Sequence, residues 1–553
     1  MKNLYKGLAA AMLLTTAWGC QKKLNENPVS KLTPAFFNTA QGFQAGLDAA
    51  YAGNRFIWGN ESFATLTIPG TDEFTSGVDG NNDINKYANN YTPSNGFLSG
   101  VWNPVYTFIN TCNGLIDNAS AVEGMDGEAV KEMTAEAKFL RANYYFILVQ
   151  LWGDVTLNVH FQDKASTAAS RQSVDKVYEQ IILDLNDAIK DLPPGPASSG
   201  VLPGKATAAA ARHLLAKVYL TRGYSVAKQA DDFSNALATA QSLLSQHAEL
   251  GMGLLPDFGD VYKPGNEQNQ EVLWSVQHTS NTAYNSNGGS TDNSLCYFFL
   301  MKYDQQPGVS RSIKYGRPFS RFMPTHWLTD TCFKERINDQ RYEKTFQTVW
   351  LANNDATIPK DGSGTPKFEV GDTAVYLPGY EVSDEQINAA RYELVPPRKY
   401  TTVIYPSLIK YDDPNRPDVN AASVRPVIVY RLAGTYLIAA EAAFQLGKRQ
   451  EAADYINVVR KRAAFPDGNP AAMVVTAADM TLDFILDERS RELCGENMRW
   501  LDLVRTHKLV ERVRLHNPDA APNIEDFEAL RPIPQSLIDA VITGPTYPQN
   551  PGW

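Results

Sequence analysis

The sequence lacks the residue patterns that most metal and redox sites require. Its five cysteines, Cys20, Cys112, Cys296, Cys332 and Cys494, lie far apart, and no two form a CxxC pair. This spacing excludes a recognisable zinc or thiol-redox motif. The seven histidines are isolated and none belongs to an HExxH pattern, so we expect no metal and no cofactor. Disulfides among the last four cysteines are one interpretation, and burial as small apolar residues is the other.

The chain also lacks the features of a nucleic-acid-binding or membrane-spanning protein. It has 51 Lys and Arg against 61 Asp and Glu, a formal net charge of −10 at pH 7. No basic run or stripe is present that would neutralise phosphates, so nucleic acid is not an expected partner. No apolar segment after the first twenty residues is long enough to span a bilayer. The composition is nevertheless 43% hydrophobic, with 26 Tyr and 9 Trp, which supplies a large core and rings for recognition.

The first twenty residues resemble an export signal rather than part of the fold. They combine two lysines, a short apolar run over residues 7–14 and small residues before Cys20. Cys20 stands where a bacterial lipoprotein signal has its acylated cysteine, although Ala17 replaces the usual leucine. We expect residues 1–19 to be removed, Cys20 to carry lipid and residues 20–30 to form a polar tether. A signal that is simply cleaved is the alternative, but it would leave an exposed thiol.

Helical periodicity predicts a mainly α-helical scaffold. Apolar residues recur at helical spacing in three stretches: about 31–53, 101–247 and 426–510. The strongest helix covers residues 127–152 and ends at Gly153, a favourable C-cap. Alanine-rich helices, each followed by a partner helix, recur at 206–244 and 430–462. Their small residues let two helices approach closely, as tetratricopeptide pairs do.

Two long stretches interrupt the helical pattern, at residues 54–100 and about 280–425. They are rich in Asn, Gly, Ser and Thr, with aromatic residues scattered among them. Long loops of this kind in compact proteins are often functional. The chain closes with a proline-rich segment, residues 515–553, which we expect to be an extended tail because proline cannot continue regular structure.

The most charged helical stretch is residues 487–505, DERSRELCGENMRWLDLVR. Glu488, Glu492 and Glu496 are four apart, which would place them on one face of a single helix. One interpretation is an active site built from paired carboxylates. We favour a structural ion-pair network that locks the last helices and the tail onto the scaffold. The interleaved arginines would lower the carboxylate pKa values and prevent general acid catalysis.

Five blocks follow one another along the chain: NENPVSKLTPAFFNT after the signal, AEAKFLRANYYFILVQLWGDV, SVDKVYEQIILDLNDAI with GKAT, YRLAGTYLIAAEA, and DERSRELCGENMRWLDLVR with LRPIPQSLIDAV and QNPGW. In this order they resemble the SusD/RagB family of Bacteroidetes surface lipoproteins. The resemblance implies one domain, residues 31–553, in which tetratricopeptide-like helix pairs carry loop-rich insertions. Cys494 and Gly495 depart from the larger or apolar residues usual in the family, which puts the local packing there in doubt.

The resemblance also implies a function. Family members capture glycan, or sometimes another nutrient, at the outer-membrane surface and pass it to a SusC-like TonB-dependent transporter, without catalysis. We therefore expect a lipid-anchored, surface-exposed protein of the outer membrane whose ligand is an oligosaccharide. A peptide-binding protein of the RagB type is the first alternative.

Sugar recognition requires stacking rings together with planar amides and carboxylates that bind hydroxyl groups. Both insertions supply such residues, and we expect the two insertions to face each other. The candidate ligand-binding residues are Trp58, Asp72, Glu73, Asn81 and Tyr91 in the first insertion and Tyr284, Asn285, Tyr297 and Trp327 in the second. For any single ring, anchoring of its own loop is the alternative interpretation.

Two further alternatives belong to other classes. A glycoside hydrolase would need two carboxylates across a cleft. Asp72, Glu73, Asp292 and Asp304 have the right residue type, but nothing in their sequence context singles out a pair. A pure interaction scaffold is the other possibility, since tetratricopeptide helices often bind peptides. We expect no enzymatic activity.

Overall fold

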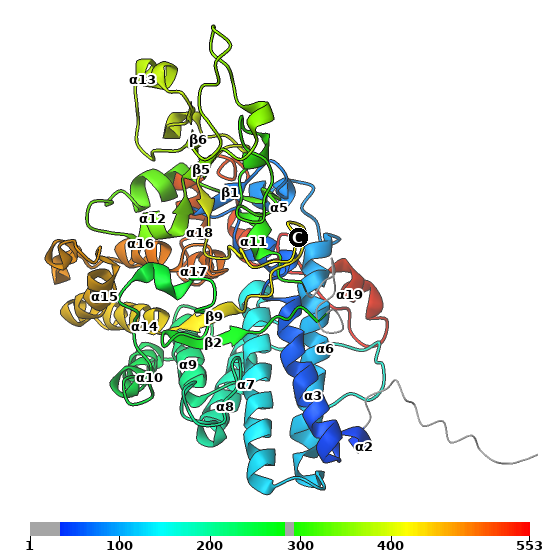
Figure 1. Ribbon diagram of the computed structural model, residues 1–553. Coiled ribbons are helices and arrows are strands. Elements are labelled where there is room, and N and C mark those ends of the chain that lie inside the picture. Colours follow the sequence, from blue (N-terminus) through cyan, green and yellow to red (C-terminus); the bar gives the residue numbers. More distant parts are fainter. Residues whose placement is uncertain (1–33, 282–291) are drawn as a thin grey trace, which may run out of the picture.

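The computed structural model describes residues 34–281 and 292–553, and helices make up most of the regular structure (Figure 1). The longer helices are α3 (Ala40–Ala52), α6 (Gly96–Asn118), α7 (Gly127–Trp152), α8 (Val174–Asp191), α9 (Ala208–Arg222), α10 (Asp232–Gln246), α14 (Leu432–Gln445), α15 (Arg449–Ala463), α16 (Leu482–Leu493), α17 (Arg499–Arg505) and α18 (Leu509–His516). The short helices are α2 (Pro34–Phe37), α4 (Glu61–Thr67), α5 (Asn82–Lys86), α11 (Leu295–Phe298), α12 (Arg341–Thr345), α13 (Asp384–Ala389) and α19 (Gln535–Ala540). The predicted mainly α class is confirmed.

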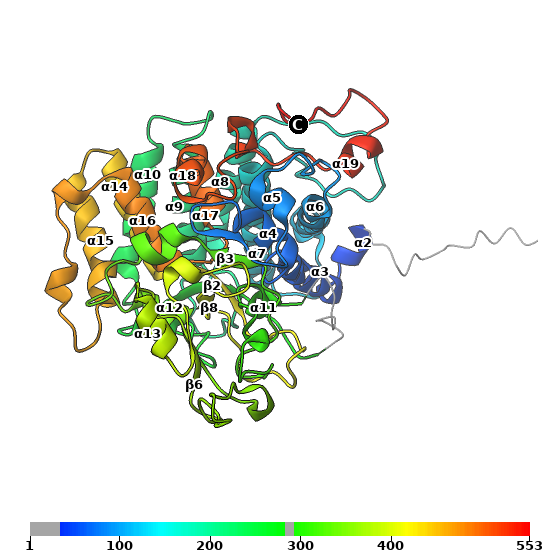
Figure 2. The same cartoon turned by 90° about the horizontal axis from the view of Figure 1, so that it is seen from above.

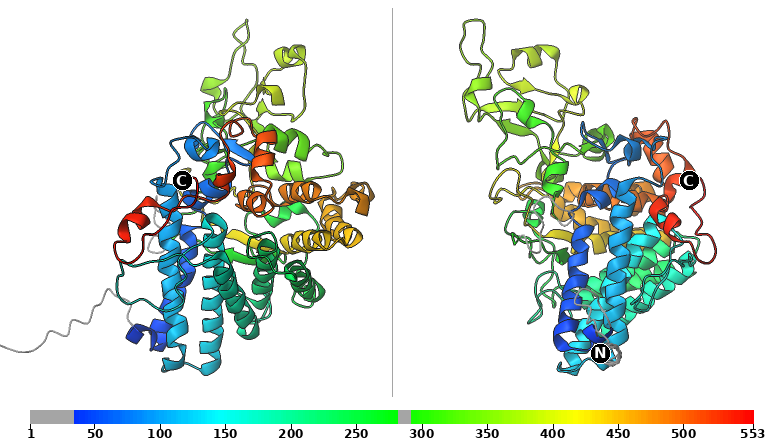
Figure 3. Two further views of the ribbon diagram at one scale, coloured as in Figure 1. Left: turned by 180° about the vertical axis from the view of Figure 1, so that it is seen from behind. Right: turned by 90° about the vertical axis from the view of Figure 1, so that its right-hand side faces the viewer.

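Successive helices of the scaffold lie side by side. α6 packs on α7, α7 on α8, α8 on α9 and α9 on α10, and α10 then contacts α14, which pairs with α15 (Figures 1 and 3). The predicted helix pairs are therefore present as α9 with α10 and α14 with α15. Their shared core consists largely of alanines, including Ala216, Ala240, Ala439 and Ala453, so the backbones approach closely.

The longest helix, α7, begins and ends as its sequence predicts. The side chain of Asp126 accepts a hydrogen bond from the Glu128 amide at the first turn, and Gly153 closes the helix with φ of 71°. Its second half is buried on nearly all sides, because α3, α6 and α8 pack around it. Trp152 at its end meets Trp102 of α6 edge to face, with ring centroids 4.9 Å apart.

The strands are short and form small sheets within the second insertion, between the two insertions and at the point where the second insertion meets the scaffold. The pairs are β1 (Phe74–Ser76) with β3 (Phe322–Pro324), β2 (Val272–Val276) with β9 (Val427–Arg431), and β4 (Phe346–Gln347) with β8 (Ser407–Leu408); β5 (Val349–Leu351), β6 (Thr373–Tyr376) and β7 (Glu393–Leu394) form a three-stranded sheet. β2 corresponds to the strand-like run EVLWSVQHT. Since β2 and β9 are antiparallel neighbours, the second insertion leaves and re-enters the scaffold at one place.

The distal part of the second insertion forms a lobe on one side of the helices (Figures 1 and 2). The lobe has an apolar core separate from that of the scaffold, built around Tyr303, Trp350, Val375 and Leu377. Trp350 and Val375 lie opposite each other on β5 and β6, so one face of the three-stranded sheet covers this core. The lobe can therefore hold its loops in place without help from the helix pairs.

Residues 487–505 do not form one helix, contrary to the sequence-based expectation. α16 ends at Leu493 and α17 begins at Arg499. Between them Gly495 and Asn497 have φ of 72° and 59°, in the left-handed region that breaks a helix. A Cβ atom on Gly495 would lie 2.5 Å from the Leu408 side chain. The glycine that departs from the family pattern thus permits both the turn and a close contact.

Other expectations also need revision. The first insertion contains the short helices α4 and α5, and the proline-rich tail contains α19 and a 3-10 turn over Asp526–Ala529 rather than being extended throughout.

Cys112, Cys296, Cys332 and Cys494 are free and buried, whereas Cys20 lies outside the described residues. Among residues 34–281 and 292–553, no helix is long and apolar enough to cross a membrane. The same residues contain no cluster of His, Cys, Asp and Glu suited to a metal ion.

Candidate functional site

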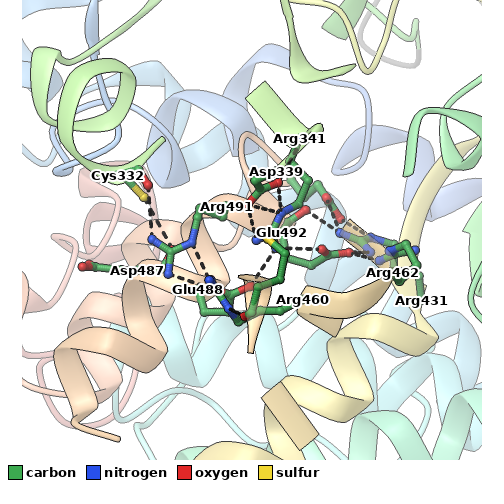
Figure 4. A network of polar contacts seen from close by, with 12 residues as sticks. Cys332, Asp339, Arg341, Arg431, Arg460, Arg462, Asp487, Glu488, Arg491 and Glu492 are labelled. Carbon is green, nitrogen blue, oxygen red and sulfur yellow. Dashed lines mark hydrogen bonds and ion pairs between the residues drawn. The ribbon is translucent and has the colours of Figure 1, made fainter. Parts of the chain in front are cut away.

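The three glutamates of the charged stretch are bound by cations rather than arranged as catalysts. Their partners come from five segments. Glu488 contacts Arg341, Arg460 and Arg491, and Glu492 contacts Arg341, Arg431 and Arg462 (Figure 4). Glu496 contacts Arg431 and Lys410. All three carboxylates are buried. We call this set of charged residues the brace.

The pKa values show why the brace cannot supply a general acid. Burial alone would raise the pKa of Glu492, but Arg462, Arg431 and Arg341 lower it to about 2. The same balance holds the pKa of Glu488 well below its usual range and lowers that of Glu496. Carboxylates that stay ionised and fully hydrogen-bonded have no proton to donate. The predicted structural network is confirmed, and the catalytic interpretation is not supported.

Ion pairs of the brace, and others beside it, also hold both insertions. Arg499 of α17 binds Asp72 of the first insertion in two places, at 2.7 and 2.6 Å, and Arg512 of α18 binds the same carboxylate at 2.5 Å. From the second insertion, Arg341 donates to Glu488 at 2.8 Å and Lys410 to Glu496 at 2.8 Å. These ion pairs therefore attach both insertions to α16, α17 and α18.

The candidate ligand residues of the first insertion are mostly internal. Trp58 is 2% exposed and packs against Phe63. Asp72 is paired as described above, and Glu73 is buried beside it; burial raises the pKa of Glu73 to about 7, although Arg499 opposes the shift. Tyr91 is buried against Trp553. Half-buried Asn81 caps α5 by accepting a hydrogen bond from the Ile84 amide.

The described candidate ligand residues of the second insertion are also internal. Tyr297 is buried, and its hydroxyl group donates to the Ala421 carbonyl. Trp327 is buried between His516, whose ring centroid lies 4.8 Å away, and the guanidinium group of Arg512, at 4.7 Å. Tyr284 and Asn285 lie outside the described residues. In this structure Trp58, Tyr91, Tyr297 and Trp327 all pack against other parts of the chain, as loop anchors do.

The two insertions do meet, as the sequence predicts. β1 pairs with β3 in antiparallel register, with Thr75 opposite Met323. Beyond the strands, the Gly77 amide donates to the Arg321 carbonyl at 3.0 Å and the Ser294 amide to the Gly59 carbonyl at 2.9 Å. A Cβ atom on Gly77 would lie only 2.3 Å from the Ser320 carbonyl oxygen, so this approach requires glycine.

The edge of this contact carries charged and aromatic side chains that are only partly buried. We call it the seam, and define it by Glu61 and Asp79 of the first insertion and Lys302, Arg317, Phe319 and Arg321 of the second. Arg321 binds Glu61 at 2.6 Å and Lys302 binds Asp79 at 2.5 Å, so ion pairs bridge the insertions.

A half-buried ring lies at the centre of the seam. Phe319 packs against Tyr297, with ring centroids 4.7 Å apart. The guanidinium carbons of Arg317 and Arg321 lie 5.0 and 5.4 Å from the Phe319 centroid. An accessible ring flanked by guanidinium and carboxylate groups can stack on the apolar face of a sugar and bind its hydroxyl groups.

The seam lies in the same two insertions as the sequence-based candidates, but it consists of other residues. The seam differs by its cations Lys302, Arg317 and Arg321, whereas the sequence-based candidates were rings, amides and carboxylates. One feature of the sequence points to these cations. Residues 302–321 hold five basic residues and a single acidic one, Asp304, within an acidic chain.

Comparisons with known proteins agree along the whole chain. A family model described as "SusD family" matches residues 247–553, and one described as "Starch-binding associating with outer membrane" matches residues 24–220. SusD-like protein P2 of Formosa agariphila is 29% identical over 98% of both chains. Starch-binding protein SusD of Bacteroides thetaiotaomicron is 23% identical over 91% of this chain and 90% of that protein.

A solved structure shares the fold. Surface glycan-binding protein A from Bacteroides thetaiotaomicron, in complex with laminarihexaose, superposes with a TM-score of 0.66 at 20% identity, covering 93% of this chain and 99% of that one. Since the first of the two family models spans more than half of the sequence, the protein belongs to the SusD (SusD/RagB) family.

Proposed function

We propose that the protein binds oligosaccharide at the seam. The observation that carries the proposal is the half-buried Phe319 ring, flanked by guanidinium and carboxylate groups where the two insertions meet. The family descriptions and the names of relatives, which mention starch and laminarihexaose, support carbohydrate as the ligand class. The buried candidates Trp58, Tyr91, Tyr297 and Trp327 then act as anchors that hold the seam in shape.

The test is calorimetric titration of the protein with laminarihexaose, maltohexaose and a set of unrelated hexapeptides. Phe319→Ala should weaken the binding of a hexasaccharide by about tenfold or more, since loss of one stacking ring costs roughly 1–3 kcal/mol. Phe233→Ala is the matched control, because Phe233 is a half-buried ring on α10 of the scaffold that packs against Tyr224. Binding of peptides and of no glycan would assign the protein to peptide uptake instead.

The proposal includes no catalysis. Asp72 and Glu73, which have the residue type of a hydrolase pair, are buried, and Asp72 is bound by two arginines. Chromatography of a bound hexasaccharide after prolonged incubation with the protein should show it intact. Shorter products that disappear with a seam variant would contradict this part of the proposal.

We further propose that Cys20 carries the lipid anchor at the outer-membrane surface and that the bound glycan passes to a SusC-like TonB-dependent transporter. The family description mentions association with the outer membrane, which supports the location. Cys20→Ala should move the protein from the membrane fraction to the soluble fraction of cells that lack the transporter. Retention in that background would exclude the anchor, because no partner transporter remains to hold the protein.

A further inference from the structure

Residues 302–321, which include the seam residues of the second insertion, are basic, whereas the whole chain is acidic. The whole chain carries 51 basic and 61 acidic residues, yet residues 302–321 contain Lys302, Arg311, Lys314, Arg317 and Arg321 against Asp304 alone. These basic residues are separated by other residues, so they form no run in the sequence. Lys302, Arg317 and Arg321 belong to the seam, and Lys302 and Arg321 reach carboxylates of the first insertion.

Three of the five cations already have a carboxylate. Lys302 binds Asp79, Arg311 binds Asp304 at 2.6 Å, and Arg321 binds Glu61. Those pairs use the acidic groups that the first insertion and the adjacent turn bring to the seam. The pairs are partly exposed, so each contributes little to stability.

The other two cations, Lys314 and Arg317, have no carboxylate partner among the described residues. The guanidinium group of Arg317 lies over the Phe319 ring, and the ammonium group of Lys314 lies 5.1 Å from the Tyr315 ring centroid. Lys314 is exposed and Arg317 is half-buried. A cation stacked on a ring is held in one orientation while its N–H donors stay available.

Arg416 adds to the positive character beneath them. It is buried, lies over the Tyr297 ring at 5.3 Å, and donates to the backbone carbonyls of Asp413, Val419, Ala421 and Ile313. The carboxylate of Asp413 is occupied by Ser423 and by backbone amides. The Tyr297 ring, which packs against Phe319, therefore lies against Arg416. No carboxylate of the described residues forms an ion pair with Arg416.

We propose that the seam, together with Lys314 three residues before Arg317, selects an anionic oligosaccharide, whose carboxylate or sulfate groups pair with these two cations while a sugar ring stacks on Phe319. This inference rests on the proposed function and narrows its ligand class. An acidic protein repels a polyanion at long range, so a local cluster of unpaired cations is the feature that such a ligand requires. Guanidinium binds the planar carboxylate and the sulfate oxygens equally well in two-point contacts, so the structure defines the charge but not its source.

The test compares three probes by calorimetric titration: a galacturonic acid hexamer, a κ-carrageenan hexasaccharide and neutral laminarihexaose. The key variant is Lys314→Gln/Arg317→Gln. The matched control is Lys176→Gln/Lys190→Gln on α8, which removes the same net charge from exposed positions far along the scaffold. At least one anionic hexasaccharide should bind, and the key variant should weaken it about tenfold at about 50 mM salt and less at about 300 mM.

The control variant should bind as the unmodified protein does. Which anionic probe binds identifies carboxylate or sulfate as the charged group. Binding of neither anionic probe, or an unchanged affinity in the key variant, overturns the inference. If laminarihexaose alone binds and Phe319→Ala weakens it, the proposed function stands and the inference fails; if no hexasaccharide binds, both fail.

Discussion

The brace and the seam are built from the same groups, carboxylates with arginine or lysine, but differ in how many partners each carboxylate has and how much water reaches it. In the brace, Glu488 and Glu492 each contact three arginines and are fully buried. At the seam, Glu61 and Asp79 each pair with one cation, and their side chains are 32% and 44% exposed.

This difference separates structural charge from charge that a ligand can use. A buried carboxylate that loses a cation leaves an uncompensated charge in a low-dielectric interior, so its partners cannot be exchanged. An exposed pair contributes at most about 1 kcal/mol, and water or a ligand can replace either member at small cost.

Replacing Glu492 by Gln should have the largest effect. The change removes one negative charge and leaves Arg341, Arg431 and Arg462 partly uncompensated in the interior. We expect the free energy of unfolding to fall by about 3–5 kcal/mol, measured by urea denaturation. Glu381→Gln, which removes an exposed partner of Arg398, is the control and should change stability by less than about 1 kcal/mol. An equal fall in the free energy of unfolding in the two variants would contradict the distinction between buried and exposed ion pairs.

The pH dependence of stability should show two opposite contributions from neighbouring carboxyl groups. Arg499 and Arg512 overcome the effect of burial and lower the pKa of Asp72 from 3.8 to about 2, so its contribution is present above pH 4 and is lost as pH falls toward 2. Burial raises the pKa of Glu73 from 4.5 to about 7, so its contribution is present below pH 4.5 and is lost as pH rises through 7. The contribution is about 2 kcal/mol for Asp72 and about 3 kcal/mol for Glu73.

Urea denaturation from pH 3 to pH 8 checks both signs. Glu73→Gln should flatten the decline between pH 4.5 and 7, because the amide stays neutral throughout this range. Asp72→Asn should be less stable at pH 7 and should vary less below pH 4. A decline that persists unchanged in Glu73→Gln would assign it to another group, of which buried Glu528, with its pKa raised to about 7, is the first to examine.

The smallest effect is expected at the seam itself. Glu61→Gln releases Arg321 from its carboxylate partner while leaving the fold intact. An anionic hexasaccharide should then bind about threefold more tightly, since an exposed pair is worth only a few tenths of a kcal/mol to 1 kcal/mol. The protein should keep its melting temperature. Weaker binding would mean that Glu61 itself contacts the ligand, as a hydroxyl acceptor.

Sequence patterns predicted the scaffold well because helix signals are local. The apolar run and Gly153 defined α7, and alanine spacing defined the pairs α9 with α10 and α14 with α15. The charged stretch around Glu492 was correctly interpreted as an ion-pair network, since interleaved arginines are visible in the sequence. Its break at Gly495 was not predicted, because the helical charge pattern continues across this residue and its close approach to Leu408, a residue far away in the chain, is visible only in the fold.

Individual site residues could not be chosen from the sequence. Trp58 and Trp327 have the residue type of sugar-stacking platforms, but whether a ring is covered depends on tertiary neighbours such as Phe63 and His516. The residue type of Asp72 suits a ligand-binding carboxylate, but Arg499, more than four hundred residues later in the chain, binds it. The meeting of the two insertions was predictable from composition, whereas the exposure of Phe319 was not.

The C-terminal segment packs on the first insertion: Arg531 donates to the Leu66 carbonyl, 465 residues away in sequence, Asn517 to that of Thr71, and Trp553 covers Tyr91. Contacts at such separation carry the highest loop-closure cost and form late in folding. We therefore expect the helix pairs, whose members are neighbours in sequence, to form before the C-terminal segment closes over the first insertion.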